Sequence, residues 1–396
     1  MKIGIITFHF PYNCGAMLQC AALQTALEKK GHEVEVIDYR PWYHQNRYTP
    51  RKNPMVFAKS CYAGKEGNAF RKFLSGCRGY GRIVLSWKDA GKKKDQDSRF
   101  KNFRVKHLHT GKVYRNIEAL KKNPPKCDLY VSGSDQLWNA HITNGELEEA
   151  YFMTFGGPEI GRITYSVGAD FSECKPGYEE ELKKLLAGID SIALRESKWL
   201  PVIEQCAPDK PTAVTVDPTF LLQKDEYDAM ITDKELETEP FIFTYTMPND
   251  TQAKINNAAK IFGEKIGMKV IDASGDPKKW NLKVEDHRLC GPDEFLWYMK
   301  HASYVFTNSF HGTAFSVIME KQFYVIPHSQ TGNRAVELLE KVGLQSRIAT
   351  SGNEAANRMT NPIDYEPVRR NKAALREESM SYLLNCIEKY GKKSGK

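Results

Sequence analysis

The segment FTNSFHGTAF, residues 306–315, places a histidine where a β-branched, aromatic run gives way to an apolar run of helical character. An imidazole exchanges protons near neutral pH, so His311 is a candidate general acid or base. Most histidines are not catalytic, and His311 taken alone would be read as a packed core residue. Its position at the end of a strand, where parallel sheets bind their ligands, favours the catalytic interpretation.

The same junction is also a candidate anion site. The first N–H groups of a helix have no partner within the helix, so Ser309 and the amides around Gly312 and Thr313 are predicted to bind a negatively charged group. Asn333 and Arg334, in the loop SQTGNRAVELL, could contact a phosphate. Simple surface exposure is the stronger expectation for these two residues.

Arg195 follows a short apolar run in the segment SIALRES. An arginine directly after a buried strand needs a partner, and two interpretations remain open. It could form a salt bridge with a nearby acid such as Glu196, or its planar fork could hold a carboxylate or a phosphate.

Two further loops follow strand-like segments. In HFPYNCG, Asn13 and Gly15 can form a tight turn at a helix start, or an ordinary connection. In SGSDQLWN, Ser134 and Asp135 follow a buried run, and Asp135 could either cap a helix or orient a substrate hydroxyl. Neither loop has the glycine pattern of a dinucleotide fingerprint or of a P-loop.

Metal and disulfide chemistry have little support in the sequence. The nine cysteines are scattered and none has CxxC spacing, which is typical of reduced thiols in a cytoplasmic protein. His107 and His109 have no third ligand at a helical or hairpin spacing. We therefore expect no metal.

Strand-like and helix-like segments alternate along the chain in two successive α/β runs. They predict two Rossmann-like, doubly wound domains, with ligands at the carboxyl ends of the strands and between the domains. We expect the first domain over residues 1–215 and the second over 216–365, with the junction near 214–222. Residues 366–396 are expected to form a C-terminal helix and a basic tail.

The net charge of +8 is concentrated in one segment: residues 41–115 hold 19 Lys or Arg and 4 Asp or Glu. This segment breaks the α/β rhythm and is expected to be a mostly helical insertion in the first domain. It could bind an anionic polymer, nucleic acid or membrane surface, or it could be a solvated insertion. No signal peptide or membrane span is evident, so we expect a cytoplasmic protein.

Several segments occur in one order: NCGAMLQCAALQTAL, VSGSDQLWN, ALRES, VDPTFLL and FTNSFHGTAFSVIMEKQFYVI. Together they resemble the polysaccharide pyruvyl transferase family, over about residues 3 to 350. The resemblance implies a two-domain, GT-B-like fold, phosphoenolpyruvate as donor, and a pair of sugar hydroxyls as acceptor. The product would be a pyruvate ketal on a surface polysaccharide or its lipid-linked precursor, with release of phosphate.

The resemblance assigns the family's histidine to His311 and its arginine to Arg195, as catalytic residues. The expected donor-binding residues are Ser309, Gly312, Thr313, Asn333 and Arg334. The expected acceptor-binding residues are Asn13, Gly15, Gln19, Ser134 and Asp135. No cofactor besides the co-substrate phosphoenolpyruvate, no metal and no nucleic acid are expected. Residues 41–115 could form an acceptor groove, or a patch that contacts the inner face of the cell membrane.

Two other functions fit parts of the sequence. A GT-B glycosyltransferase that uses a nucleotide sugar would share the fold, but it needs a site for base and ribose that the sequence does not reveal. A non-catalytic module that grips an anionic polymer would use the basic segment alone, and it would be insensitive to replacement of His311.

Overall fold

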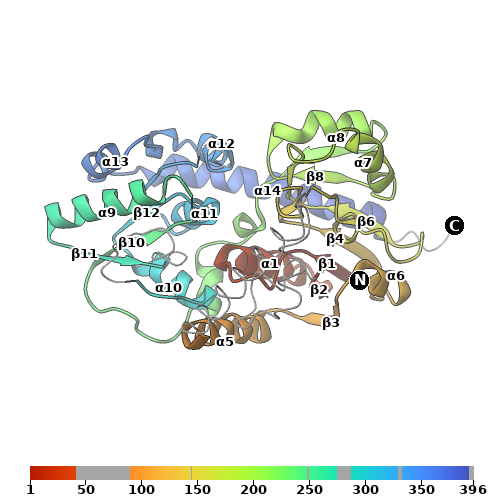
Figure 1. Ribbon diagram of the computed structural model, residues 1–396, viewed down its shortest axis with the longest axis horizontal. Helices are drawn as coiled ribbons and strands as arrows, with labels where there is room; N and C mark the ends of the chain where they lie inside the picture. Colours follow the sequence, from red (N-terminus) through yellow and green to blue (C-terminus); the bar gives the residue numbers. More distant parts are fainter. Residues whose placement is uncertain (42–89, 144, 248, 274–286, 329–331, 392–396) are drawn as a thin grey trace, which may run out of the picture.

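The computed structural model describes residues 1–396 apart from six stretches, which are 42–89, 144, 248, 274–286, 329–331 and 392–396. The chain forms two α/β halves that lie side by side, and each half is built on parallel strands (Figure 1). The predicted fold, two Rossmann-like units in a GT-B-like arrangement, is confirmed. Much of the basic segment 41–115 lies outside the described residues.

The N-terminal half is built on a five-stranded parallel sheet of order β3-β2-β1-β4-β6. Its strands are β1 (Lys2–Ile6), β2 (Glu33–Tyr39), β3 (Thr110–Tyr114), β4 (Leu129–Ser132) and β6 (Gly161–Thr164). Both faces are covered, because Ile3 and Ile5 belong to one buried cluster while Ile6 belongs to another. Such two-sided burial is why these strands read as continuous apolar runs.

The N-terminal half contains a second parallel sheet, which is formed by later strands of the chain. Its order is β5-β7-β8-β9, with β5 (Asp135–Asn139), β7 (Val167–Asp170), β8 (Ile192–Leu194) and β9 (Thr212–Val214). An isolated bridge between Ile163 and Ser191 ties it to the first sheet. The strand-like segment GRITYSVGAD, 161–170, forms two strands rather than one, and the chain is divided at Ser166, whose φ is 55°.

Helices cover both faces of these sheets. They are α1 (Cys14–Glu28), α5 (Ala90–His107), α6 (Ile117–Lys122), α7 (Tyr178–Leu186) and α8 (Leu200–Cys206), with 3-10 turns η2 (Glu149–Phe152) and η3 (Ser197–Trp199). The expectation of a mostly helical insertion needs one correction. Residues 110–114 form β3, which pairs in parallel with β2 and extends the sheet.

The C-terminal half carries a four-stranded parallel sheet of order β11-β10-β12-β13. Its strands are β10 (Phe241–Tyr245), β11 (Lys269–Asp272), β12 (Tyr304–Thr307) and β13 (Gln322–Val325). The helices around it are α9 (Gln252–Ile266), α10 (Pro292–His301), α11 (Phe310–Ile318), α12 (Asn333–Val342) and α13 (Gly352–Arg358), with the 3-10 turn η7 (Gln345–Arg347). Alternate residues face opposite clusters, so this sheet is doubly wound as well.

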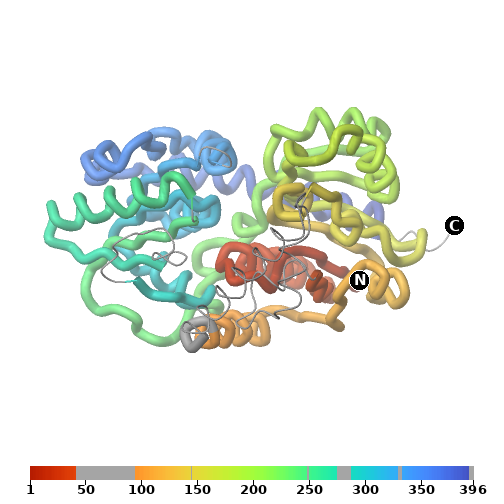
Figure 2. The backbone as a smooth tube through the Cα atoms, in the orientation of Figure 1, coloured from red at the N-terminus to blue at the C-terminus, as the bar shows by residue number. Residues whose placement is uncertain are grey.

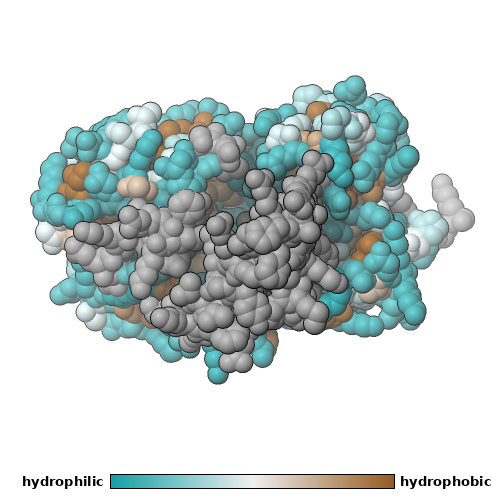
Figure 3. Space-filling view, viewed as in Figure 1, coloured by the Kyte–Doolittle hydropathy of each residue, from teal (hydrophilic) through white to brown (hydrophobic). Residues whose placement is uncertain are grey.

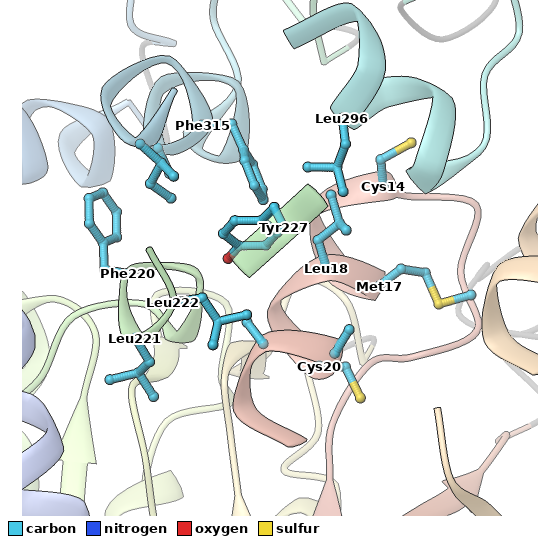
Figure 4. Packing of buried hydrophobic residues seen from close by; sticks show 14 of the residues in the cluster. Cys14, Met17, Leu18, Cys20, Phe220, Leu221, Leu222, Tyr227, Leu296 and Phe315 are labelled. Carbon is cyan, nitrogen blue, oxygen red and sulfur yellow. The ribbon is translucent and has the colours of Figure 1, made fainter. Parts of the chain in front are cut away.

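The two halves share one apolar core. The turns η4 (Pro218–Leu221) and η5 (Asp225–Met230) connect them, and α1 packs against η4 and α10. Figure 4 shows Leu18 of α1 facing Leu296 of α10, with Tyr227 and Phe315 beside them. Because this contact is apolar and continuous, it fixes the N-terminus of α1 against the second half.

The last helix, α14 (Tyr365–Tyr390), starts on the C-terminal half and crosses back to the N-terminal half (Figure 2). Ser379 Oγ accepts a hydrogen bond from the Val216 amide at 3.0 Å, and the Tyr382 hydroxyl lies 2.9 Å from Ser191 Oγ. The helix therefore straps the two halves together. The predicted domain junction at 215/216 stays a prediction, although α14 contacts the chain at that point.

The face shown in Figure 3 is mostly hydrophilic over the described parts of both halves. Large exposed apolar side chains are few among the described residues, namely Val105, Val113 and Ile266. No helix in the described part of the chain is both long and apolar enough to cross a membrane.

Candidate functional site

A cavity of about 180 Å³ lies between the two halves. Residues from the N-terminal half include Asn13, at the start of α1, and Asp135, at the start of β5. Its polar lining consists of Asn13, Asp135, Gln136, Ser309, His311 and Arg334. Five of these six residues were candidates from the sequence, and the fold brings them together from loops far apart in the chain.

His311 stands in the first turn of α11, directly after β12. It is 6% exposed, and its ring packs edge to face on Phe310 with 5.2 Å between ring centroids. Its Nε2 atom is buried, lies 3.6 Å from Asp217 Oδ2, and forms no hydrogen bond to the described residues. His311 therefore both lines the cavity and lies beside a buried acid.

Asp217 is the buried acid at the centre of the site, with a side chain that is 0% exposed. Its Oδ1 accepts hydrogen bonds from the Thr219 amide at 3.0 Å and from Thr219 Oγ1 at 2.8 Å. Its Oδ2 accepts from Ser134 Oγ and from Arg195 Nη1, both at 3.1 Å. Burial favours the neutral acid, but His311 and Arg195 outweigh it and hold the pKa of Asp217 well below its usual range.

Arg195 follows β8 and is almost fully buried, with 2% of its side chain exposed. Its Nε donates to Glu196 Oε1 at 2.9 Å, and its Nη1 donates to Asp217. Burial works against the charged form, but Glu196 and Asp217 raise the pKa of Arg195 above its ordinary value. The guanidinium also stacks on Phe310, 4.5 Å from the ring centroid.

These contacts decide between the two interpretations of Arg195. The salt bridge with Glu196 is present, and the residue does not line the cavity. The structure therefore does not show Arg195 placed to bind substrate directly, because its guanidinium group already donates to the carboxylates of Glu196 and Asp217. Arg195 instead holds Asp217 and Phe310 in place around His311.

Gly15 is in the first turn of α1 and lies against the His311 ring. A Cβ atom at position 15 would stand 2.2 Å from both Cγ and Nδ1 of His311, so only glycine allows this approach. Asn13 caps the same helix, with its Oδ1 accepting from the Ala16 amide at 3.2 Å. The amide of Gly15 forms no hydrogen bond to other described residues, as expected in the first turn of a helix.

The start of α11 is arranged differently from the prediction. Ser309 caps the helix, and its Oγ accepts from the Gly312 amide at 3.3 Å, while its carbonyl accepts from the Thr313 amide at 2.9 Å. The amides of Gly312 and Thr313 are thus engaged within the helix. At the start of α11, the amides of Phe310 and His311 are the ones that have no partner among the described residues.

The predicted acceptor residues divide into two groups. Asn13 and Asp135 line the cavity, and Asp135 has a φ of 71°, a left-handed conformation that aspartate tolerates better than most residues. Gln19 is fully buried, with its amide nitrogen bonded to Thr7 Oγ1 and its oxygen to the Ser134 amide. Gln19 and Ser134 therefore support the loop from the protein interior, since their side chains hydrogen-bond to protein groups.

The predicted donor residues on α12 also separate. Arg334 lines the cavity, and its Nε lies 3.9 Å from Glu196 Oε1. Burial and the neighbouring charge of Arg195 lower the pKa of Arg334, so an anion there would relieve the repulsion between two cations. Asn333 begins α12 but is exposed and does not line the cavity.

A family model described as polysaccharide pyruvyl transferase matches residues 13–330. The chain belongs to the polysaccharide pyruvyl transferase family. A sequence search of curated proteins gave no match.

Solved structures of other proteins resemble this chain in fold at low sequence identity. A UDP-N-acetylglucosamine 2-epimerase from Rickettsia bellii has 12% identity and a TM-score of 0.52, with 99% of this chain and 97% of that chain covered. A Listeria monocytogenes protein assigned to the same enzyme type has 12% identity and a TM-score of 0.51, with 98% and 95% covered. A spinosyn rhamnosyltransferase has 12% identity and a TM-score of 0.44, with 98% and 100% covered.

The sequence interpretation missed three residues of this transferase site: Asp217, Gln136 and Phe310. Asp217 was not among the candidates, although an acid after an apolar run in VTVDPTF is a signal for a buried partner. The Gln136 side chain lies 2.8 Å from Arg195 Nη2, and Gln136 accepts a hydrogen bond from this nitrogen when the amide oxygen faces Arg195.

Among the described residues, no group of three His, Cys, Asp or Glu could hold a metal ion.

Proposed function

We propose that the protein transfers the pyruvate unit of phosphoenolpyruvate to two hydroxyls of a sugar, forming a pyruvate ketal and releasing phosphate. The observation that carries the proposal is the position of His311. It lines a cavity together with Arg334 and the starts of α1 and α11. A proton-transfer residue thus stands beside groups that attract an anion.

The electrostatics of the cavity suit a small, highly charged donor. Two helix N-termini meet there, at Gly15 and His311, and each carries partial positive charge and at least one amide that has no partner among the described residues. Arg334 adds a full charge at the cavity wall. Phosphoenolpyruvate has a carboxylate and a phosphate, and both can accept hydrogen bonds from amides and a guanidinium.

The size of the cavity favours the same donor. Its volume of about 180 Å³ lies below the roughly 300–1,000 Å³ of pockets for drug-sized ligands. A three-carbon phosphate ester is compatible with this space more readily than a nucleotide sugar. This difference supports the pyruvyl donor over the glycosyltransferase alternative.

The proposed reaction needs one proton-transfer residue, because His311 can first donate a proton and then accept one. The protonated His311 gives a proton to the methylene carbon of phosphoenolpyruvate, and C2 becomes electrophilic. The first sugar hydroxyl attacks C2 and returns its proton to His311. The second hydroxyl then forms the other C2–O bond, the bond from C2 to the phosphate oxygen breaks, and the second hydroxyl's proton leaves on phosphate.

The acceptor would enter from the N-terminal half. Asn13 and Asp135 line that side of the cavity, and their oxygens can accept hydrogen bonds from sugar hydroxyls. The family supports a sugar or polysaccharide as acceptor. We propose a sugar of a surface polysaccharide or of its lipid-linked precursor, which would place the enzyme near the inner face of the membrane.

The test is phosphate release from phosphoenolpyruvate with a panel of acceptor sugars. We expect release by the wild type and a loss of about 100-fold to 10,000-fold for His311→Gln, the range that general acid–base catalysis contributes. His301→Gln is the matched control, because His301 is in α10 and its Nδ1 bonds to the Trp297 carbonyl. The proposal fails if phosphoenolpyruvate neither turns over nor raises the melting temperature while a nucleotide sugar does raise it.

A further inference from the structure

The two ring nitrogens of His311 face different surroundings. Nε2 is buried and points toward Asp217 Oδ2 at 3.6 Å, whereas Nδ1 lies on the side of Gly15. Asn13 and Ala16, which lie close to Gly15 in the first turn of α1 and at its cap, line the cavity. The nitrogen on the cavity side of the ring is therefore Nδ1.

We propose that Asp217 is a positioning residue that keeps a proton on Nε2 of His311, so that Nδ1 is the nitrogen that exchanges protons with substrate. This inference rests on the proposed function, since it names the atom of His311 that would carry out that chemistry. Asp217 itself lies outside the cavity lining, so it would act on the reaction through His311.

The carboxylate of Asp217 is suited to this task because it cannot turn away. Thr219 holds Oδ1 with two hydrogen bonds, and Ser134 and Arg195 hold Oδ2 from the opposite side. All of these groups donate, so the ionised carboxylate remains an acceptor toward His311. A buried acceptor beside Nε2 requires a proton on that nitrogen.

The tautomer of the neutral ring follows from this requirement. With a proton fixed on Nε2, the lone pair is on Nδ1, where it can accept the proton of a sugar hydroxyl. In the cationic ring, Nδ1 carries the proton that goes to the substrate carbon. The distance of 3.6 Å is longer than a hydrogen bond, and such contacts in a substrate-free site commonly shorten when substrate binds.

A spectroscopic experiment tests the inference without any turnover. The protein is labelled with 15N-histidine, the His311 signals are assigned by comparison with His311→Gln, and the neutral tautomer is recorded on the alkaline side of the titration of that ring. We expect the Nε2–H tautomer in the wild type. In Asp217→Asn we expect a shift toward Nδ1–H, because the charge that requires the Nε2 proton has been removed.

The inference is overturned if wild-type His311 is in the Nδ1–H tautomer, or if the Asp217→Asn spectrum matches that of the wild type. The wild-type measurement stands alone if Asp217→Asn does not fold. Because neither spectrum depends on the acceptor or on phosphate release, an inactive wild type would count against the proposed function and not against the Asp217–His311 pairing.

Kinetics provides a second readout. For Asp217→Asn, kcat should fall about 100-fold, within the range of general acid–base effects, while KM for phosphoenolpyruvate changes little. Asp217→Glu keeps the charge and should recover part of kcat. Thr219→Val, which removes one donor from Oδ1 and leaves His311 untouched, should lose much less of kcat. Equal losses in Thr219→Val and Asp217→Asn would show that Asp217 acts only through the fold.

Discussion

Gly15 and His311 touch across the boundary between the two halves of the protein. The first turn of α1 passes so close to the imidazole that a Cβ atom at position 15 would lie 2.2 Å from His311 Nδ1. The continuous apolar packing of Leu18 with Leu296 and Phe315 keeps the two helices at this distance. The place of the imidazole is thus set by both halves together.

Replacing Gly15 with alanine should therefore damage catalysis more than folding. The added methyl group must displace the His311 ring, and a misplacement of about 1 Å can lower a rate about 100-fold. We expect kcat for phosphate release to fall by about this factor. The matched control is Gly188→Ala, because a Cβ there meets no atom within 4 Å. If both variants keep wild-type kcat, the His311 ring is not held by this contact.

The low pKa of Asp217 predicts a pH-dependent contribution to stability. A carboxyl with a depressed pKa in the folded state stabilises the protein above its unfolded pKa, about 3.9, and loses this contribution as the pH falls further. Asp217→Asn should lower the free energy of unfolding by about 3 kcal/mol at pH 7, because the buried Arg195 loses one of the two carboxylates that neutralise it. The difference from wild type should narrow below about pH 4.

Urea unfolding at several pH values measures this difference. Asp233→Asn is the control, since it makes the same chemical change at an exposed carboxyl in the loop after η5. The control should follow the wild-type curve. A wild-type advantage over Asp217→Asn that persists unchanged at pH 3 would contradict the assigned ionisation of Asp217.

Arg334→Ala should weaken binding of phosphoenolpyruvate. A hydrogen bond to a charged group contributes about 1.5–3 kcal/mol, so KM for phosphoenolpyruvate should rise about tenfold or more. We expect kcat to change less, because Arg334 is not the proton-transfer residue. Arg358→Ala, at a half-exposed ion pair with Glu354 on α13, is the control. An unchanged KM in Arg334→Ala would remove this arginine from the donor site.

Ser379→Ala tests the role of α14 as a strap. The change leaves the buried amide of Val216 without its acceptor, which costs about 1–3 kcal/mol of unfolding free energy. Chemical unfolding followed by circular dichroism measures the loss. Ser381→Ala, two residues along the same helix and exposed, controls for the loss of a hydroxyl. Equal stabilities of the two variants would show that the Ser379 contact contributes nothing.

Local patterns were enough to place many elements. The segment EVEVIDY, 33–39, has the pattern of a strand, and Pro292 and Asp293 are typical of a helix start; these segments form β2 and α10. Period, caps and a proline at the first helical position act over a few neighbouring residues, so they can be read from the chain directly. The same reasoning failed at Ser166, where one left-handed residue divides a predicted strand.

By itself, the sequence determined the doubly wound fold and the family and singled out His311 as a candidate, because periodicity and motifs are properties of short segments. Tertiary structure alone decided the partners. It directed Arg195 to Glu196 and Asp217, placed Gln19 in the interior, and brought Gly15 against His311. These contacts join residues from separate segments, and they form only when apolar packing brings the two halves together.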